Sequence, residues 1–347
     1  MTRLRSILTG LLVAVISFAA TLVLIEVGFR ITGVEPIPRP EKEQYRYEEN
    51  SHGLRDYERA YEKEEGVFRI VATGDSFTFG TGVPSMEAIF LKRLERALNA
   101  GSQDGRRFEV INGAQPGYNT PHEYEWLKKE GVRYSPDLIM VVYFFNDATS
   151  MGTVTSLMRP IHEEAAGRSE GWSVLYTYFK YRIMRSVISR RTTEEYRQAY
   201  FEGKGGSTKT GRWEKCQECI LGIKELAEAN DAGLLFVTFP ILIDLDEDYA
   251  FQDIHDIVVG FLTRNEIEVH SLLPAFVEYD GTAESLWVNI TNAHPNARGH
   301  EIAARSPPIC LNPVCWRDRW SPPLACWNQA CRRIIAPAGD ISRKGRR

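Results

Sequence analysis

The chain has 347 residues, of which 43% are hydrophobic and 25% are charged, and its formal net charge is −4. This composition is typical of a globular protein with enough apolar residues for one large domain or two small ones. The net charge does not indicate a nucleic-acid partner, because nucleic-acid-binding proteins present an excess of Lys and Arg. Six cysteines in a chain of this length do not make a disulfide scaffold.

An uncharged apolar run occupies residues 7–25, which is close to the roughly 20 residues needed to cross a bilayer. Arg3 and Arg5 precede the run and favour a cytoplasmic N-terminus, so we expect the soluble part to be extracytoplasmic. A cleaved signal peptide is the alternative, because residues 17–19 have the small-x-small pattern of a cleavage site. Cleavage there would leave an apolar N-terminus, which favours an uncleaved single-pass membrane anchor over residues 1–27.

A polar linker is predicted over residues 28–64, and prolines stiffen its start. Strand-like and helix-like patterns then alternate through residues 65–305. They predict strands at residues 67–73, 108–114, 137–145, 233–240 and 267–270, and helices at residues 85–98, 121–130 and 213–229. Strands separated by helices imply a parallel sheet covered on both faces, so we expect an α/β fold, a three-layer α/β/α sandwich with about five parallel strands.

Residues 148–210 interrupt this alternation with a stretch rich in aromatic residues and arginines. Three interpretations are open, namely a surface helical insertion, a lid over the site, or a helix that lies on the membrane. The stretch follows the carboxyl end of the strand predicted at residues 137–145, which is the edge where open α/β sheets bind ligands.

A tight turn, Gly74-Asp75-Ser76, ends the first predicted strand and precedes a helical pattern. A serine on such a turn lies at the carboxyl edge of the sheet, where backbone N–H groups at the helix start can receive a developing negative charge. The alternative is an ordinary strand–turn–helix connection with a capping residue. Asp75 is expected to brace the turn by hydrogen bonds without reacting.

Three further polar stretches are residues 112–118, 145–147 and 293–300. The first two follow predicted strands, and the third precedes a short helix. With the Ser76 turn, in this order, they resemble the SGNH (GDSL-type) hydrolase family over residues 51–304. Each stretch alone has a structural explanation, such as a turn, a helix cap or a packed histidine, and only the combination carries the resemblance.

The resemblance implies a flavodoxin-like SGNH hydrolase fold and a serine esterase that needs no cofactor or metal. Ser76 would be the nucleophile and His294 its general base, since a serine hydroxyl attacks only when a base takes its proton. The oxyanion would be held by the N–H groups of Ser76 and Gly117 and by the Asn146 amide. The implied substrate is an extracytoplasmic ester, with O-acetyl groups on carbohydrate as the candidate.

Two positions depart from the family pattern. Phe144 stands where a glycine is usual before the Asn146-Asp147 pair. Asn292 stands where an aspartate usually orients the catalytic histidine, and it can accept a hydrogen bond from His294 but brings no charge. In a serine protease, the corresponding Asp-to-Asn change costs about 10⁴ in kcat, so we expect reduced activity.

Two alternatives to an esterase stay open. An O-acyltransferase of cell-surface polysaccharide would use the same acyl-enzyme, with a sugar hydroxyl in place of water, and residues 172–181 could line its acceptor groove. A catalytically impaired SGNH-fold binding protein is favoured by Asn292 and by the unusual C-terminal tail.

That tail, residues 306–347, carries four cysteines, three tryptophans and a basic end, and prolines near its start stop the preceding helix. The C-x₄-C-x₁₀-C-x₄-C spacing matches no common zinc site, although disulfides are an option outside the cytoplasm. We expect an atypical, poorly ordered tail with no metal. Cys216 and Cys219 lie on a predicted helix and are expected to be half-buried thiols.

Overall fold

The computed structural model describes residues 2–33, 46–102, 105–148, 173–201, 212–243, 245, 248–289 and 292–306. The chain divides into two compact units, one of Met1–Glu43 with Gly152–Glu195 and the other of Gln44–Met151 with Tyr196–Arg347. The predictions for the tail beyond Ser306 and for Trp172 lie outside the described residues.

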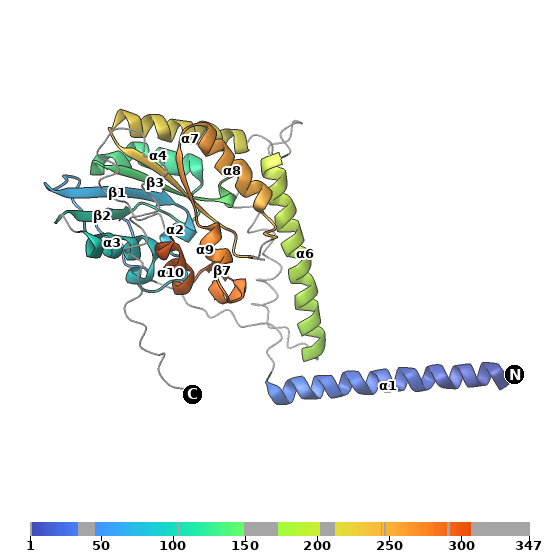
Figure 1. The fold of residues 1–347 in the computed structure, drawn as a ribbon. Helices are drawn as coiled ribbons and strands as arrows, with labels where there is room; N and C mark the ends of the chain where they lie inside the picture. Colours follow the sequence, from blue (N-terminus) through green and yellow to red (C-terminus); the bar gives the residue numbers. More distant parts are fainter. Residues whose placement is uncertain are drawn as a thin grey trace, which may run out of the picture. The chain divides into compact units, whose positions relative to one another are not determined.

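The second unit is built on a five-stranded sheet (Figure 1). The strands pair in the order β2-β1-β3-β4-β5, and every pairing is parallel. This is the order of flavodoxin-like doubly wound folds. Their bounds are β1 (Val67–Gly74), β2 (Arg107–Asn112), β3 (Leu138–Phe144), β4 (Gly233–Phe239) and β5 (Glu268–Ser271). The predicted parallel sheet is confirmed, and β3 is buried along its whole length, as its continuous apolar sequence predicts.

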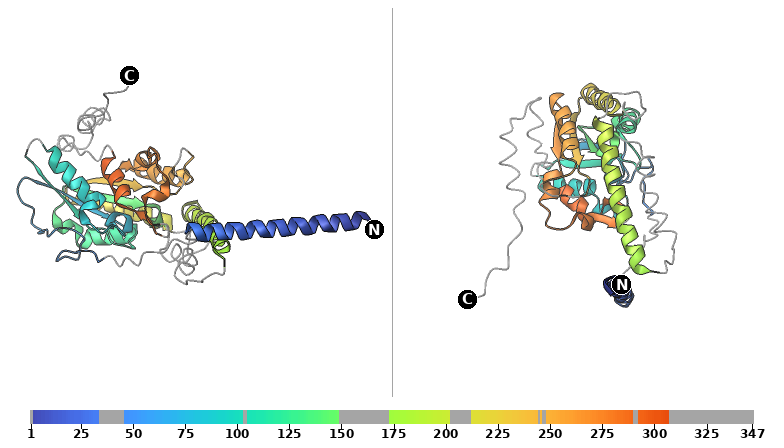
Figure 2. Two further views of the ribbon diagram at one scale, coloured as in Figure 1. Left: turned by 90° about the horizontal axis from the view of Figure 1, so that it is seen from below. Right: turned by 90° about the vertical axis from the view of Figure 1, so that its right-hand side faces the viewer.

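Helices cover both faces of this sheet (Figure 1 and Figure 2). On one face α4 (Thr120–Lys129) packs against α7 (Arg212–Ala229), and on the other α3 (Phe90–Gly101) packs against α10 (Ala297–Arg305). The predicted three-layer α/β/α sandwich is therefore confirmed. Cys216 and Cys219 on α7 are free and fully buried, more so than the half-buried thiols that were expected.

Several elements were not predicted from the sequence. They are α8 (Gln252–Arg264), α9 (Leu273–Val277) and an antiparallel hairpin of β6 (Trp287–Asn289) and β7 (Asn292–Pro295). A further helix, α6 (Val174–Phe201), lies within the stretch of residues 148–210 that the sequence analysis interprets as a helical insertion. The helix expected at residues 85–98 instead begins at Phe90, after a short 3₁₀ turn, η1 (Met86–Ala88). The reason is a tertiary contact: Ile89 is extended, and the Phe90 N–H donates to His300 Nδ1 at 3.1 Å.

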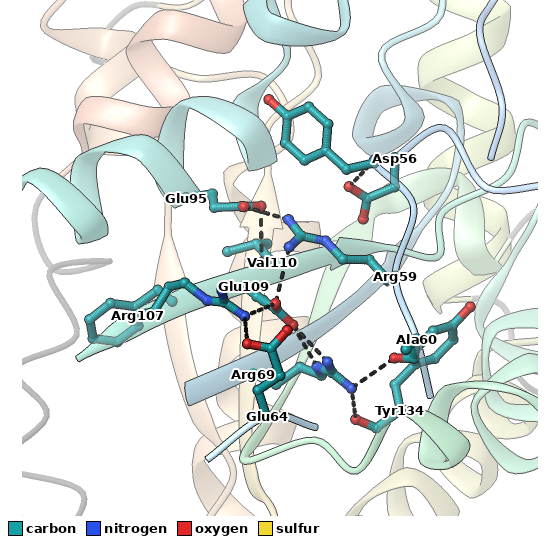
Figure 3. A network of polar contacts seen from close by, with 12 residues as sticks. Asp56, Arg59, Ala60, Glu64, Arg69, Glu95, Arg107, Glu109, Val110 and Tyr134 are labelled. Atoms are coloured by element: carbon teal, nitrogen blue, oxygen red, sulfur yellow. Dashed lines mark hydrogen bonds and ion pairs between the residues drawn. The ribbon is translucent and has the colours of Figure 1, made fainter. Parts of the chain in front are cut away.

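Residues 50–64 were assigned to the linker, but the structure packs them onto the domain, where Arg55 and Asp56 are buried. Figure 3 shows how charged side chains fasten this segment to the start of the sheet. Arg59 reaches Glu95 at 2.5 Å and Glu109 at 3.2 Å. Buried charges are tolerated only when they are paired, and here the pairs join the segment to α3 and β2.

The first unit contains α1 (Thr2–Thr32), whose stretch Leu4–Thr32 is long and apolar enough to cross a membrane. A signal sequence near an N-terminus passes the same test of length and composition.

Candidate active site

Ser76 is the first residue of α2 (Ser76–Phe79), a single helical turn directly after β1. Asp75 caps this turn, because its Oδ1 accepts a hydrogen bond from the Phe77 N–H at 2.8 Å. Gly80 ends the turn with φ +85°, a left-handed conformation that favours glycine, and its N–H donates to the Ser76 carbonyl at 3.1 Å. Ser76 is thereby fixed at the carboxyl edge of the sheet, as the sequence predicts.

Arg55 holds the far end of the same turn. Its guanidinium donates to the carbonyl oxygens of Gly80 at 2.6 Å, Phe79 at 3.1 Å and Val83 at 2.5 Å. Burial lowers the pKa of Arg55 to about 10, so the group stays charged at neutral pH. The sequence analysis missed this residue, because nothing in the local pattern pairs Arg55 with a turn that follows it by more than twenty residues.

His294 lies in β7, and its ring contacts Ser76, which lies 218 residues earlier in the sequence. Its Nε2 lies 2.8 Å from Ser76 Oγ, and its Nδ1 lies 2.5 Å from Asn292 Oδ1. An amide oxygen can only accept, so Nδ1 carries the proton and Nε2 is the acceptor for the Ser76 hydroxyl. Burial lowers the pKa of His294 to about 4, which keeps the ring neutral and able to take a proton at neutral pH.

Asn146 lies in η3 (Phe145–Ala148), the turn that follows β3. Its Nδ2 donates to Asp75 Oδ2 at 2.9 Å. An amide nitrogen carries two hydrogens, and one of them is directed to Asp75. Burial raises the pKa of Asp75 to about 6, while the Phe77 and Asn146 hydrogen bonds act against that rise. Asp75 thus braces the turn and Asn146 and makes no bond to His294, as expected.

The backbone around Asn146 is held by a contact that the sequence did not predict. Tyr200, near the end of α6, donates from its hydroxyl to the Phe145 carbonyl at 3.0 Å, and its oxygen also lies 2.6 Å from Tyr143 Oη. Tyr200 is buried, so this end of the predicted insertion is part of the support of the site.

Gly117 lies in a turn after β2, with φ +87° and Pro116 before it. The Tyr118 N–H closes the turn on the Gln115 carbonyl at 3.1 Å. The Gln115 N–H in turn donates to the Gly74 carbonyl at 3.2 Å, which joins this turn to the end of β1. The structure thus places Gly117 at the edge that carries Ser76, whereas its part in an oxyanion hole stays a prediction.

Aromatic rings pack beside the nucleophile. Phe77 stacks on Phe144 with 3.9 Å between ring centroids and lies 5.3 Å from the His294 ring. Phe144, the residue that replaces the usual glycine of the family pattern, therefore fills space next to the Ser76 turn.

Two further carboxyl groups, Glu123 and Asp147, are buried near Asp75. Burial raises the pKa of each well above its ordinary value, and repulsion between the buried carboxylates adds to the rise. In the part of the chain that the structure describes, no group of three His, Cys, Asp or Glu side chains is arranged to hold a metal ion.

No family model and no curated protein matches this sequence. Solved structures with a similar fold include the acetylxylan esterase Axe2 from Geobacillus stearothermophilus, at 12% identity and a TM-score of 0.44, covering 69% of this chain and 91% of that one. A lipase from a goat rumen metagenome, Lip_vut3, has 16% identity and a TM-score of 0.43, with 68% and 94% covered. TesA has 10% identity and a TM-score of 0.42, with 68% and 93% covered. At such low scores the likeness carries no argument, so the function is inferred from the geometry of the site.

Proposed function

We propose that this chain is a serine esterase of the SGNH (GDSL) type, with Ser76 as nucleophile and His294 as base. The observation that carries the proposal is the hydrogen-bond chain from Ser76 Oγ through the His294 ring to Asn292 Oδ1. Such a chain activates a serine hydroxyl, because the ring accepts its proton while the third residue fixes the ring's tautomer. A histidine with only a structural role would not require this arrangement, in which one ring nitrogen contacts a serine at a strand-to-helix turn and the other contacts an orienting amide.

The reaction follows from these positions. Ser76 Oγ attacks the carbonyl carbon of the ester and its proton moves to His294 Nε2. The resulting oxyanion accepts hydrogen bonds from the N–H groups of Ser76 and Gly117 and from the side-chain amide of Asn146. His294 then returns the proton to the departing alcohol, which leaves an acyl-enzyme. A water molecule, deprotonated by His294, hydrolyses the acyl-enzyme and frees Ser76.

Asn292 limits the rate of this cycle. Its Oδ1 selects the productive tautomer of His294, but it adds no negative charge beside the imidazolium that forms when the ring takes the serine proton. Together with a pKa of about 4 for His294, this makes the ring a weak base, since a good general base has a pKa near the working pH.

The proposed substrate is an extracytoplasmic ester with a small acyl group, such as an O-acetyl group on a carbohydrate. The small acyl group comes from the family resemblance, and the stack of Phe77 on Phe144 places apolar side chains beside the nucleophile. The extracytoplasmic location rests on α1 as an anchor with Arg3 and Arg5 on its cytoplasmic side.

The decisive test of the activity is labelling by a fluorophosphonate probe, combined with hydrolysis of short-chain p-nitrophenyl esters. We expect the wild-type protein to label at Ser76 and to hydrolyse p-nitrophenyl acetate, and Ser76→Ala to do neither while its melting temperature stays nearly unchanged. Ser85→Ala, at an exposed serine nearby, is the matched control and should behave as wild type. If the wild-type protein neither labels nor turns over any ester, it is a binding protein of this fold.

The anchor is tested separately. Membranes washed with carbonate should retain the protein, and protease added outside the cytoplasmic membrane should digest the domain. Recovery of a soluble species trimmed near Ala19 or Ala20 would show instead that the N-terminal segment is a cleaved signal peptide.

A further inference from the structure

A carboxylate near the C-terminal end of α1 contacts the first turn of α6. The Glu26 carboxylate accepts hydrogen bonds from the Ser173 hydroxyl at 2.9 Å and from the N–H groups of Val174 at 3.0 Å and Leu175 at 2.8 Å. These are donors that the start of a helix leaves without partners, and a carboxylate there also interacts favourably with the helix dipole. Glu26 therefore caps α6.

This junction lies at the level of the membrane surface if α1 spans a bilayer. The uncharged run at residues 7–25 matches the thickness of the hydrocarbon core, and Glu26 is the first charged residue after it. Figure 1 shows that α6 begins beside α1 and runs at a steep angle to it rather than alongside it. A helix that starts at the interface and runs at a steep angle to a membrane-spanning helix lies along the surface of the bilayer.

The first half of α6 carries an exposed apolar stripe. Its members recur every three or four residues, a spacing that places them on one side of a helix, and each is at least 45% exposed: Tyr176, Phe179, Ile183 and Val187. Exposed aromatic and aliphatic side chains in a continuous row mark a surface that binds a partner.

The contact with α1 also indicates which way this stripe faces. Phe29, about one turn beyond Glu26 and so further from the hydrocarbon core, packs edge-on against Tyr178 with 5.4 Å between ring centroids. Tyr178 lies on the side of α6 opposite to Ile183 and Val187, because successive helical residues are about 100° apart. The stripe thus points back toward the bilayer.

The charge of this segment is complementary to a lipid surface. Residues 174–193 contain five basic residues and no acidic one: Lys180, Arg182, Arg185, Arg190 and Arg191. Basic residues with aromatic and aliphatic side chains on one helix face are typical of helices that lie at the interface of membranes containing anionic lipids.

We propose that the first half of α6 is an interfacial membrane helix, whose stripe of Tyr176, Phe179, Ile183 and Val187 docks on a bilayer with anionic headgroups. This inference rests on the proposed membrane anchor and is independent of the esterase activity. Of the three interpretations of the insertion, it selects the helix on the membrane for this half of α6.

The test uses the full-length chain in vesicles of phosphatidylcholine and phosphatidylglycerol, with the photocrosslinking residue p-benzoylphenylalanine at single positions. Position 179 represents the stripe, Tyr178 on the opposite side of the helix is the matched control, and Val15 in α1 reports insertion of the anchor. We expect lipid adducts at position 15 and at position 179, with about tenfold less adduct at position 178.

Three results would overturn the proposal. Lipid adducts at position 15 without any at position 179, or crosslinks from position 179 to a second copy of the chain, would refute the docking of α6 while leaving the anchor intact. Lipid adducts at neither position would refute the anchor itself and, with it, the docking of α6. All three outcomes can be told apart from a failure of the esterase proposal, because none of them depends on turnover.

Discussion

The two halves of the proposed site are built in different ways. The nucleophile side is embedded in the domain: the Ser76 turn follows a buried strand, Asp75 caps it, and Arg55 bonds the carbonyls at its far end. The base side is a short antiparallel hairpin outside the main sheet, where His294 is oriented by Asn292, two residues away in the same strand.

The comparison shows which interactions fix the geometry of each half of the site. On the nucleophile side, charged and polar groups from distant parts of the chain hold the backbone itself. On the base side, a neutral hydrogen bond to Asn292 orients the His294 side chain, and burial lowers the pKa of His294 without an opposing negative charge. We therefore expect changes on the nucleophile side to reduce activity or stability, and one change on the base side to improve activity.

The largest effect is expected from His294→Gln, which removes the base. In a serine protease, loss of the base lowers kcat by about 10⁶, so we expect the largest fall in kcat from this change, together with the loss of fluorophosphonate labelling at Ser76. The control is His122→Gln, at an exposed histidine on α4. Substantial turnover in His294→Gln, measured on p-nitrophenyl acetate, would assign the base to another residue.

Asn146→Ala tests the oxyanion hole on the nucleophile side. Loss of one donor to the oxyanion costs about 3–4 kcal/mol of transition-state stabilisation, so kcat should fall by about 10²–10³ while KM changes little. The pKa of Asp75 should rise further, because it loses the Asn146 hydrogen bond. An unchanged kcat would leave Asn146 with a structural role only, and Asn230→Ala at an exposed turn serves as the control.

Arg55→Met tests the support of the nucleophile turn. The substitution leaves the carbonyls of Phe79, Gly80 and Val83 without their buried donor, so the free energy of unfolding should fall by about 3 kcal/mol. Denaturant unfolding of the second unit measures this loss. Arg96→Met, at an exposed ion pair with Glu87, should cost less than about 1 kcal/mol. Equal losses in the two variants would mean that the turn does not depend on Arg55.

Asn292→Asp places a negative charge beside the base. We expect it to give the smallest of these changes, an increase in activity. A hydrogen bond to a charged partner is worth about 1.5–3 kcal/mol against about 1 for a neutral one, so kcat should rise roughly tenfold or more. Only neutral His294 can act as base, so activity is lost as the pH falls through its pKa of about 4. The added charge raises that pKa, and the acid limb of kcat/KM against pH should move upward.

The matched control for this gain is Asn230→Asp, which adds the same charge at an exposed position far along the chain. A wild-type pH profile and rate in Asn292→Asp would show that another group orients His294.

Much of the architecture could be read from the sequence. Continuous apolar runs such as residues 137–145 predicted the strands, and their separation by helices predicted a parallel sheet, because each pattern reports burial along a local segment. The polar stretches at strand ends located Ser76 and Asn146 at one edge of the sheet for the same reason.

The tertiary structure decided what depends on contacts between distant segments. The hairpin that carries His294 is too short to show a periodic pattern, and it is fixed only by its pairing and by the domain beneath it. Arg55, Tyr200 and the Glu26 cap of α6 act on backbone groups that lie far from them in the sequence, and no local pattern records such a partner. The sequence by itself determined which residue types could carry the chemistry, while their distances and protonation were decided by the burial and hydrogen bonding that only the folded chain creates.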